Sequence, residues 1–315
     1  MTIKTIATIL TILALATGTA KAGPMTLARL QKRLALPQLA DMTNTVEISD
    51  GTNTVVLHPG YRRIVVNGSA AWLNGPAEAD FRNRLTVDTA DATRFLAPLI
   101  RGRPAAVTNG TFRVFIDPGH GGEDSGAISR LNGLKEKDLV LDLAMRVGAY
   151  LEDAGLDVVY SRTDDVFLAL EERSALARRK GAHAFVSLHA NTTGGPAARG
   201  AETFTLTLAG FDSTSQDSRL THEERPGNAF DADSGRLGHA IHTRLPGRRG
   251  DADRGLRHAR FQVLRQAPCP AVLVECGFLS NPDETRSLAS PRFRERTAKA
   301  IAEGIADYAK RAQRK

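Results

Sequence analysis

From residue 112 onward, short apolar runs alternate with longer stretches in which apolar residues recur every three or four positions. Short apolar runs bounded by glycine and polar residues predict buried strands, and the wider spacing predicts amphipathic helices. The predicted strands are residues 113–117, 157–161, 184–188, 203–208, 261–264 and 271–274, and the predicted helices are residues 136–151, 168–180, 234–245 and 291–310. This alternation predicts an α/β fold, with a mainly parallel sheet covered by helices on both faces.

Residues 24–105 follow a different pattern. Period-two apolar segments separated by glycine, asparagine and proline predict short strands, and Asn67-Gly68 predicts a tight hairpin turn. Residues 88–97 predict a short helix that Pro98 would end. We therefore predict a small β-rich N-terminal domain over residues 24–105, a linker rich in glycine and proline, and a larger domain over residues 112–313.

The first 22 residues predict a secretory signal peptide. Lys4 precedes an apolar run over residues 6–16, and Ala20-Lys21-Ala22 provides small residues for cleavage. The run is too short to span a bilayer comfortably, although an uncleaved anchor is the alternative interpretation. We expect an exported protein that is periplasmic, secreted or associated with the cell wall.

The overall charge narrows the class of partner. A formal net charge of +7 favours nucleic acid, an anionic membrane or a carboxylate-rich polymer. Aromatic residues are only 5% of the chain, which argues against a stacking surface for nucleic acid. Cys269 and Cys276 flank a predicted strand, so their Cα atoms would lie about 20 Å apart, beyond the roughly 7 Å reach of a disulfide. We expect two free, buried thiols.

Two histidines and one acid follow predicted strands, and a second acid begins a predicted helix. In open α/β sheets, ligands bind at the carboxyl ends of the strands. Three strands end in His120, His189 and Glu275, and Glu136 begins the helix that follows the first of them. Two imidazoles and one carboxylate are a common ligand set for catalytic zinc, with a fourth position left for water. A further carboxylate at the same place is suited to proton transfer.

Five segments resemble the zinc-dependent N-acetylmuramoyl-L-alanine amidases of the amidase 3 family. They are VFIDPGHGG at residues 114–122, KEKD at 135–138, SRTDD at 161–165, SLHAN at 187–191 and AVLVECGFLSN at 271–281. The resemblance runs from about residue 112 to 310. It implies that His120, Glu136 and His189 bind Zn²⁺ and that Glu275 is the catalytic acid/base. It also implies a peptidoglycan substrate, cut at the amide between N-acetylmuramic acid and L-alanine of the stem peptide.

The chemistry of amide cleavage agrees with that resemblance. Zinc lowers the pKa of a bound water and polarises the scissile carbonyl, while a nearby carboxylate takes and returns a proton. Glu275 suits this role because burial on an apolar strand would raise its pKa. A metal-bound histidine usually donates its other ring nitrogen to an acceptor, and the candidate acceptors are Asp117, Glu123 and Asn191.

Other polar residues have weaker functional interpretations. His239 and His242 are spaced as a metal pair, but such a pair more often lies on a solvated helix face. We expect structural or surface roles for His58, His183, His222 and His258. Arg254 and Arg257 are either ligands for a stem-peptide carboxylate or a charged pair at the end of a strand, and a substrate contact is an alternative for Glu202.

Two functional alternatives remain open from the sequence. One is an inactive wall-binding or regulatory protein of the same fold, and the other is a zinc peptidase acting within the stem peptide. Residues 210–234 lack an amphipathic period, so we expect no autoinhibitory helix there. A monomer is expected, and the need for an activator protein stays open.

Overall fold

The computed structural model describes residues 23–42, 45–107, 110–214, 223–245 and 253–313. The predicted signal peptide lies outside these residues. In the part of the chain that is described, no helix has the length and apolar character needed to cross a membrane.

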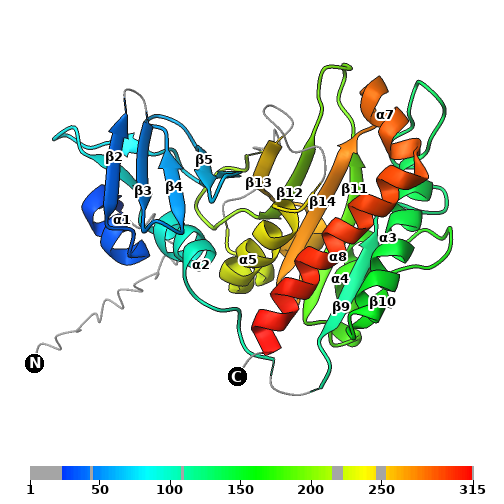
Figure 1. Cartoon of the computed structure of the whole chain (residues 1–315). Coiled ribbons are helices and arrows are strands. Elements are labelled where there is room, and N and C mark those ends of the chain that lie inside the picture. The colour runs from blue at the N-terminus through cyan, green and yellow to red at the C-terminus, as the bar shows by residue number, and fades with distance from the viewer. Residues whose placement is uncertain (1–22, 43–44, 108–109, 215–222, 246–252, 314–315) are drawn as a thin grey trace, which may run out of the picture.

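A mainly parallel sheet forms the larger part of the molecule (Figure 1). Its strands, in spatial order, are β10 (Asp157–Tyr160), β9 (Arg113–Pro118), β11 (Ala184–Asn191), β14 (Ala271–Phe278), β12 (Ala201–Leu206) and β13 (Asp253–Ala259). The first four run parallel to one another, β12 is antiparallel to β14, and β13 is parallel to β12. The predicted α/β architecture is therefore confirmed.

Helices cover both faces of this sheet because successive strand residues point to opposite sides. Val114 and Ile116 face one side, where they pack with α3 (Glu136–Asp153), α5 (Asp231–His242) and α8 (Pro291–Gln313). Phe115 faces the other side, where its ring stacks on Phe185 at 5.5 Å between centroids. That side is covered by α4 (Leu170–Arg179) and α6 (Gln262–Arg265), and α7 (Pro282–Ala289) follows β14.

The N-terminal region is rich in β-strands, as predicted. An antiparallel meander consists of β2 (Gln38–Met42), β3 (Thr45–Ser49), β4 (Thr54–Leu57), β5 (Arg63–Val66) and β6 (Ser69–Trp72). A small antiparallel sheet contains β1 (Pro24–Thr26), β8 (Leu85–Asp88) and β7 (Glu78–Ala79), and the helices are α1 (Leu27–Leu34), η1 (Asp91–Leu96) and α2 (Ala97–Ile100). The hairpin turn at Asn67-Gly68 is present, with φ angles of 50° and 76°.

The meander and the larger sheet are continuous. Strand β6 runs parallel to β13, with Ala71 opposite Leu256. The five strands of the meander and the six strands of the larger sheet therefore form one sheet of eleven strands. The Trp72 indole donates a hydrogen bond to the Arg254 carbonyl at 2.9 Å, and the His258 ring contacts the Trp72 carbonyl at 2.7 Å. The N-terminal region is therefore attached through backbone and side chains to the last strand of the α/β sheet.

Two predictions about individual elements were wrong. Residues 262–265 form helix α6 rather than a strand, and the strand in this part of the chain is β13. Pro98 does not end the helix before it: η1 leads directly into α2, with Pro98 in its first turn. The Ala97 amide donates to the Ala92 carbonyl, so the helical hydrogen bonds of η1 continue up to the residue before Pro98.

Candidate active site and metal centre

Three of the predicted residues form one cluster. The ligand atoms of His120, Glu136 and His189 all lie within 4.8 Å of one another. His120 follows β9, Glu136 is the first residue of α3, and His189 lies in β11. Glu136 Oε1 lies 3.1 Å from His120 Nε2 and 2.9 Å from His189 Nδ1. Two imidazoles converging on one carboxylate suit a divalent metal such as zinc.

Two glycines allow this close approach. A Cβ atom at Gly119 would lie 2.3 Å from His189 Cε1, and one at Gly126 would lie 2.6 Å from His120 Cδ2. His120 itself has a φ of 58°, in the left-handed region that residues other than glycine rarely adopt. Such backbone strain persists where the surrounding structure holds it in place, often at functional sites.

Glu136 is held by backbone as well as by the histidines. Its two oxygens accept hydrogen bonds from the amides of Ala127 at 2.8 Å and Ala190 at 2.9 Å. Burial by itself would raise the pKa of this carboxyl, but hydrogen bonds from His120 and His189 outweigh it and lower the pKa. Glu136 is therefore an ionised, fixed ligand candidate.

Asp124 is the carboxylate that orients His120. Its Oδ2 lies 2.8 Å from His120 Nδ1, the ring nitrogen that faces away from Glu136. The candidates predicted from the sequence for this role are Asp117, Glu123 and Asn191, and for His120 that prediction is wrong. Asp124 follows His120 by four positions in the glycine-rich loop, and this spacing was the available signal in the sequence.

Asp117 supports the glycine-rich loop indirectly, by binding Arg173. It is fully buried and binds the Arg173 guanidinium at 2.9 Å. Arg173 also donates to the carbonyls of Pro118 at 2.9 Å and His120 at 2.8 Å. This buried arginine therefore fixes the backbone that carries His120.

Glu275 lies beside the cluster, directly opposite His189 in the β11–β14 pairing. It is 8% exposed, and its Oε2 has no hydrogen-bond partner among the described residues. Burial, followed by the charges of Glu136 and Glu202, raises the pKa of Glu275 well above its usual value. A raised pKa favours the protonated form of a carboxyl, which suits a group that accepts and returns a proton.

All four predicted site residues line one cavity of about 540 Å³, which we call the main cavity. One of its walls is apolar and consists of Phe167, Leu168, Leu170, Phe261 and Val263. The lining also includes Glu275 and the three candidate metal ligands, His120, Glu136 and His189. Arg173 is the basic residue in the lining, and its charge is already paired with Asp117.

Glu202 lies on the neighbouring strand, β12, next to Glu275. It is 1% exposed and lies opposite Glu275 in the β12–β14 pairing. It accepts hydrogen bonds from Asn191 at 2.8 Å and Arg254 at 2.9 Å, and it also pairs with Arg257. The two arginines therefore form a charged group with Glu202. A charged pair at this place is one of the two interpretations that the sequence allows for Arg254 and Arg257.

The remaining histidines have structural surroundings where they are described. His242 is fully buried and contacts Asp253 at 2.9 Å and Thr203 at 3.0 Å, so the expected solvated helix face was wrong for this residue. Burial lowers the pKa of His258 to about 3. Within the described ranges, the group of three metal-ligand residues found is His120, Glu136 and His189.

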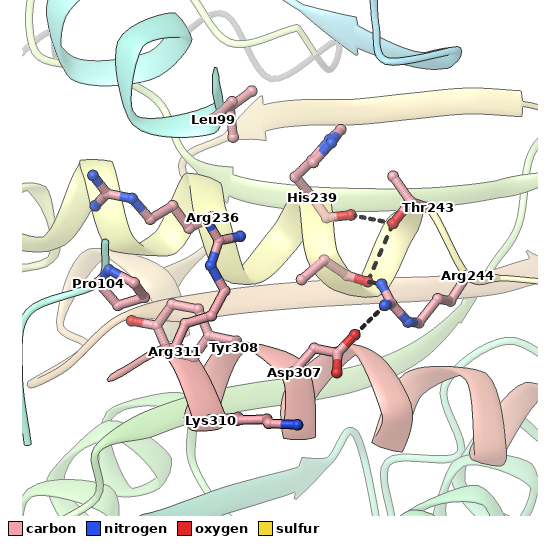
Figure 2. Close-up of a pocket in the computed structure, with 11 residues that line it drawn as sticks. Leu99, Pro104, Arg236, His239, Thr243, Arg244, Asp307, Tyr308, Lys310 and Arg311 are labelled. Atoms are coloured by element: carbon pink, nitrogen blue, oxygen red, sulfur yellow. Dashed lines mark hydrogen bonds and ion pairs between the residues drawn. The ribbon is translucent and has the colours of Figure 1, made fainter. Parts of the chain in front are cut away.

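A second cavity of about 300 Å³ lies between α5 and α8, on the sheet face opposite the main cavity (Figure 2). Its lining includes His239, Arg236, Lys310 and Arg311. Figure 2 shows Arg244, which follows the end of α5, paired with Asp307 of α8. It has no cluster of metal ligands within the described residues, and it shares no lining residue with the main cavity.

The segment expected to lack an autoinhibitory helix is described only in part. Residues 215–222 lie outside the described residues. Residues 210–214 and 223–234 do not contribute to the lining of the main cavity. The expectation for the whole segment stays a prediction.

Comparison with known proteins places these motifs in a family. The family model of N-acetylmuramoyl-L-alanine amidases called Amidase_3 matches residues 114–307. The chain is 36% identical over 230 residues to amidase AmiA of Escherichia coli, covering 65% of this chain and 79% of AmiA. It is also 36% identical over 195 residues to amidase LytC of Bacillus subtilis, but spans only 35% of that longer protein.

A solved structure shares the fold of the same region. The catalytic domain of CwlV, an N-acetylmuramoyl-L-alanine amidase from Bacillus (Paenibacillus) polymyxa, aligns with a TM-score of 0.53 and 34% identity. The alignment covers 64% of this chain and 99% of that domain. The N-terminal region lies outside the family match. The chain belongs to the Amidase_3 family of N-acetylmuramoyl-L-alanine amidases.

Proposed function

We propose that this protein is a zinc-dependent amidase that cleaves peptidoglycan between N-acetylmuramic acid and L-alanine of the stem peptide. The observation that carries the proposal is the convergence of His120, Glu136 and His189 beside Glu275 in one cavity, inside the segment that matches the family. We further propose that the protein acts outside the cytoplasm, where its wall substrate lies.

His120, Glu136 and His189 would hold the zinc ion. Two neutral imidazoles and an ionised carboxylate are the donor set that zinc prefers in hydrolases, and the low pKa of Glu136 keeps its carboxylate available. When bound, zinc acidifies a water molecule and polarises the carbonyl of the scissile amide. The glycine-rich loop and Arg173 hold the ligands in place before substrate arrives.

Glu275 would move the proton. Its side chain faces the main cavity next to the triad, and Oε2 has no partner among the described residues that would compete for a proton. As general base it takes a proton from the attacking water, and as general acid it gives that proton to the amine of L-alanine. The amine then leaves as a neutral group.

Product analysis separates this reaction from cleavage within the stem peptide. Purified protein with zinc should release intact stem peptides and leave glycan chains without peptide, as measured by mass spectrometry. A chelator should abolish release, and added zinc should restore it. Products cut inside the peptide would identify a peptidase instead, and no release with zinc bound would favour the inactive wall-binding alternative.

The role of Glu275 has its own test. We expect Glu275→Gln to bind zinc with the same stoichiometry as the unchanged protein while kcat falls by a factor of about 10²–10⁴, the usual contribution of general acid–base catalysis. Thermal unfolding should show an intact fold, because glutamine removes a buried carboxyl without changing its volume. Activity close to that of the unchanged protein would refute the assigned role.

A further inference from the structure

A small cavity lies where the N-terminal region meets β13. It has a volume of about 300 Å³ and is lined by Arg63, Trp72, Asp253, Arg254 and Arg257. We call it the arginine pocket. Arg63 and Trp72 come from the β5–β6 hairpin, and the other three residues come from β13. Both parts of the molecule are therefore needed to form it.

The arginine pocket and the main cavity open on the same face of the sheet. Glu275 and Glu202 are directly opposite on neighbouring strands, so their side chains share a face. Glu202 binds Asn191, which lines the main cavity, and also Arg254 and Arg257, which line the arginine pocket. Glu202 is thus a buried carboxylate that bonds to lining residues of both cavities.

Strand spacing gives the distance from the predicted catalytic residue to the pocket. Strands β14, β12 and β13 are successive neighbours, and neighbouring strands lie about 4.8 Å apart, so the step from Glu275 to β13 is about 10 Å. An extended peptide of about three residues spans this distance. The first residues of a stem peptide cut at the triad therefore reach β13, and Arg63, on β5 two strands further along the sheet, lines the same pocket.

The charges differ between the two cavities. The lining of the main cavity includes the carboxyl groups of Asp124, Glu136 and Glu275, which disfavour a carboxylate on the substrate. In the arginine pocket, Arg63 is exposed and the side chain of Arg254 is 32% exposed. Asp253 also lines this pocket, and its carboxylate is bound by the His242 ring and the Ala70 amide. Arg254 uses Nε to bind Glu202, and within the described residues no hydrogen bond engages its two terminal nitrogens.

Ring contacts and ion pairs hold Arg254 and Arg257 in place, which suits them to bind a flat anionic group. The Arg257 guanidinium lies 4.9 Å from the centre of the Trp72 ring, and the Arg254 guanidinium lies 5.0 Å from that of Phe278. Cation–π contacts and the Glu202 ion pair restrict the arginine side chains before any ligand binds. Arginine binds carboxylates with two parallel hydrogen bonds, so a preordered arginine pays a smaller entropy cost for such a contact.

We propose that the arginine pocket binds a free carboxylate of the stem peptide, so that the N-terminal region supplies part of the substrate site. The proposal rests on the proposed amidase function. It also orients the substrate: the peptide extends across β12 towards β13, and the sugar lies towards Phe167, beside the loop that follows β9. Arg63 is the contact contributed by the N-terminal region.

The test compares two muramoyl tripeptides, one with free carboxylates and one with these carboxylates amidated. For the whole protein with zinc, we expect a KM about tenfold lower for the free acid, in line with a partly exposed charge-assisted contact. Arg63→Glu should remove that preference by raising the KM for the free acid, while the KM for the amidated tripeptide changes much less. Arg82→Glu is the matched control, because Arg82 lies in the β7–β8 turn of the other sheet and should leave the preference intact.

A binding measurement keeps the proposal testable if no cleavage occurs. Calorimetry with Glu275→Gln, alone and combined with Arg63→Glu, measures the Kd for both tripeptides. Tighter binding of the free acid that depends on Arg63 supports the pocket even if the reaction proposed above is wrong. Equal affinity for acid and amide, or equal losses in the Arg63 and Arg82 variants, overturns the proposal.

Discussion

His120 depends on one carboxylate outside the metal cluster. Asp124 holds the ring nitrogen that points away from Glu136. Asp124→Asn removes the charge that makes this imidazole a stronger donor, so we expect zinc affinity to fall by about tenfold or more. Competition with a chromogenic chelator measures the Kd. Glu123→Gln is the control, since Glu123 is adjacent and exposed, and a similar loss in that variant would contradict a specific role for Asp124.

The convergence of the four candidate residues was predictable because each follows a strand or begins a helix. Hydrophobic patterning locates strand ends, and the carboxyl ends of parallel strands meet at one place in the fold. Asp124 was not found this way because it lies in a loop whose path is set by glycines with positive φ, which leave no periodic signal. The ion pairs of Glu202 were not predictable because its arginine partners come from a strand about 50 residues away.

At the scale of elements, the turn after β9 tolerates no side chain at Gly119. A Cβ there would lie 2.3 Å from Cε1 and 2.5 Å from Nε2 of His189. Gly119→Ala should therefore displace this ring and lower zinc affinity at least tenfold, while the helix and strand content measured by circular dichroism stays unchanged. Gly194→Ala, at a position with no neighbouring atom within 4 Å, should bind zinc normally. Equal zinc affinity in the two variants would refute this account.

Strand β13 shows why one element escaped prediction. Its sequence, DRGLRHA, has charged or polar residues at four of seven positions, which does not predict a buried strand. Arg254 and Arg257 are accommodated because Glu202 on β12 binds them, and His258 because Trp72 and Thr205 bind its ring. Burial of such side chains depends on partners distant in the sequence, so local patterning cannot indicate it.

At the scale of the whole molecule, Asp91 links the two parts of the structure. Its carboxyl accepts hydrogen bonds from the Asn74 amide and side chain, both at 2.9 Å. The Asn74 side chain in turn accepts from the Leu208 amide at 3.0 Å, beyond the end of β12. Asp91 is fully buried, and burial raises its pKa to about 6 despite these hydrogen bonds.

This pKa predicts how stability depends on pH. An unfolded aspartate has a pKa near 3.9, so between about pH 4 and 6 the unfolded chain loses a proton that the folded chain keeps. The contribution of Asp91 to the free energy of unfolding should therefore fall as pH rises through this window, by up to about 3 kcal/mol, and stay level above it. Urea unfolding at several pH values measures this slope.

Asp91→Asn should remove that part of the slope, although the amide will lower stability at every pH because it cannot accept all three hydrogen bonds. Asp283→Asn is the control, since that side chain is 92% exposed and contributes no buried carboxyl. If Asp91→Asn and the unchanged protein share one slope between pH 4 and 6, the raised pKa is wrong.

The pairing of β6 with β13 also determines the order in which the molecule is completed during synthesis. Residues 69–72 leave the ribosome about 180 residues before their partner strand at residues 253–259. Until then β6 is an edge strand with unpaired backbone groups, a surface that favours association between chains. The N-terminal meander is thus translated first, but its edge strand β6 is paired last. A chain that ends before residue 253 is therefore expected to aggregate rather than remain as a stable, soluble domain.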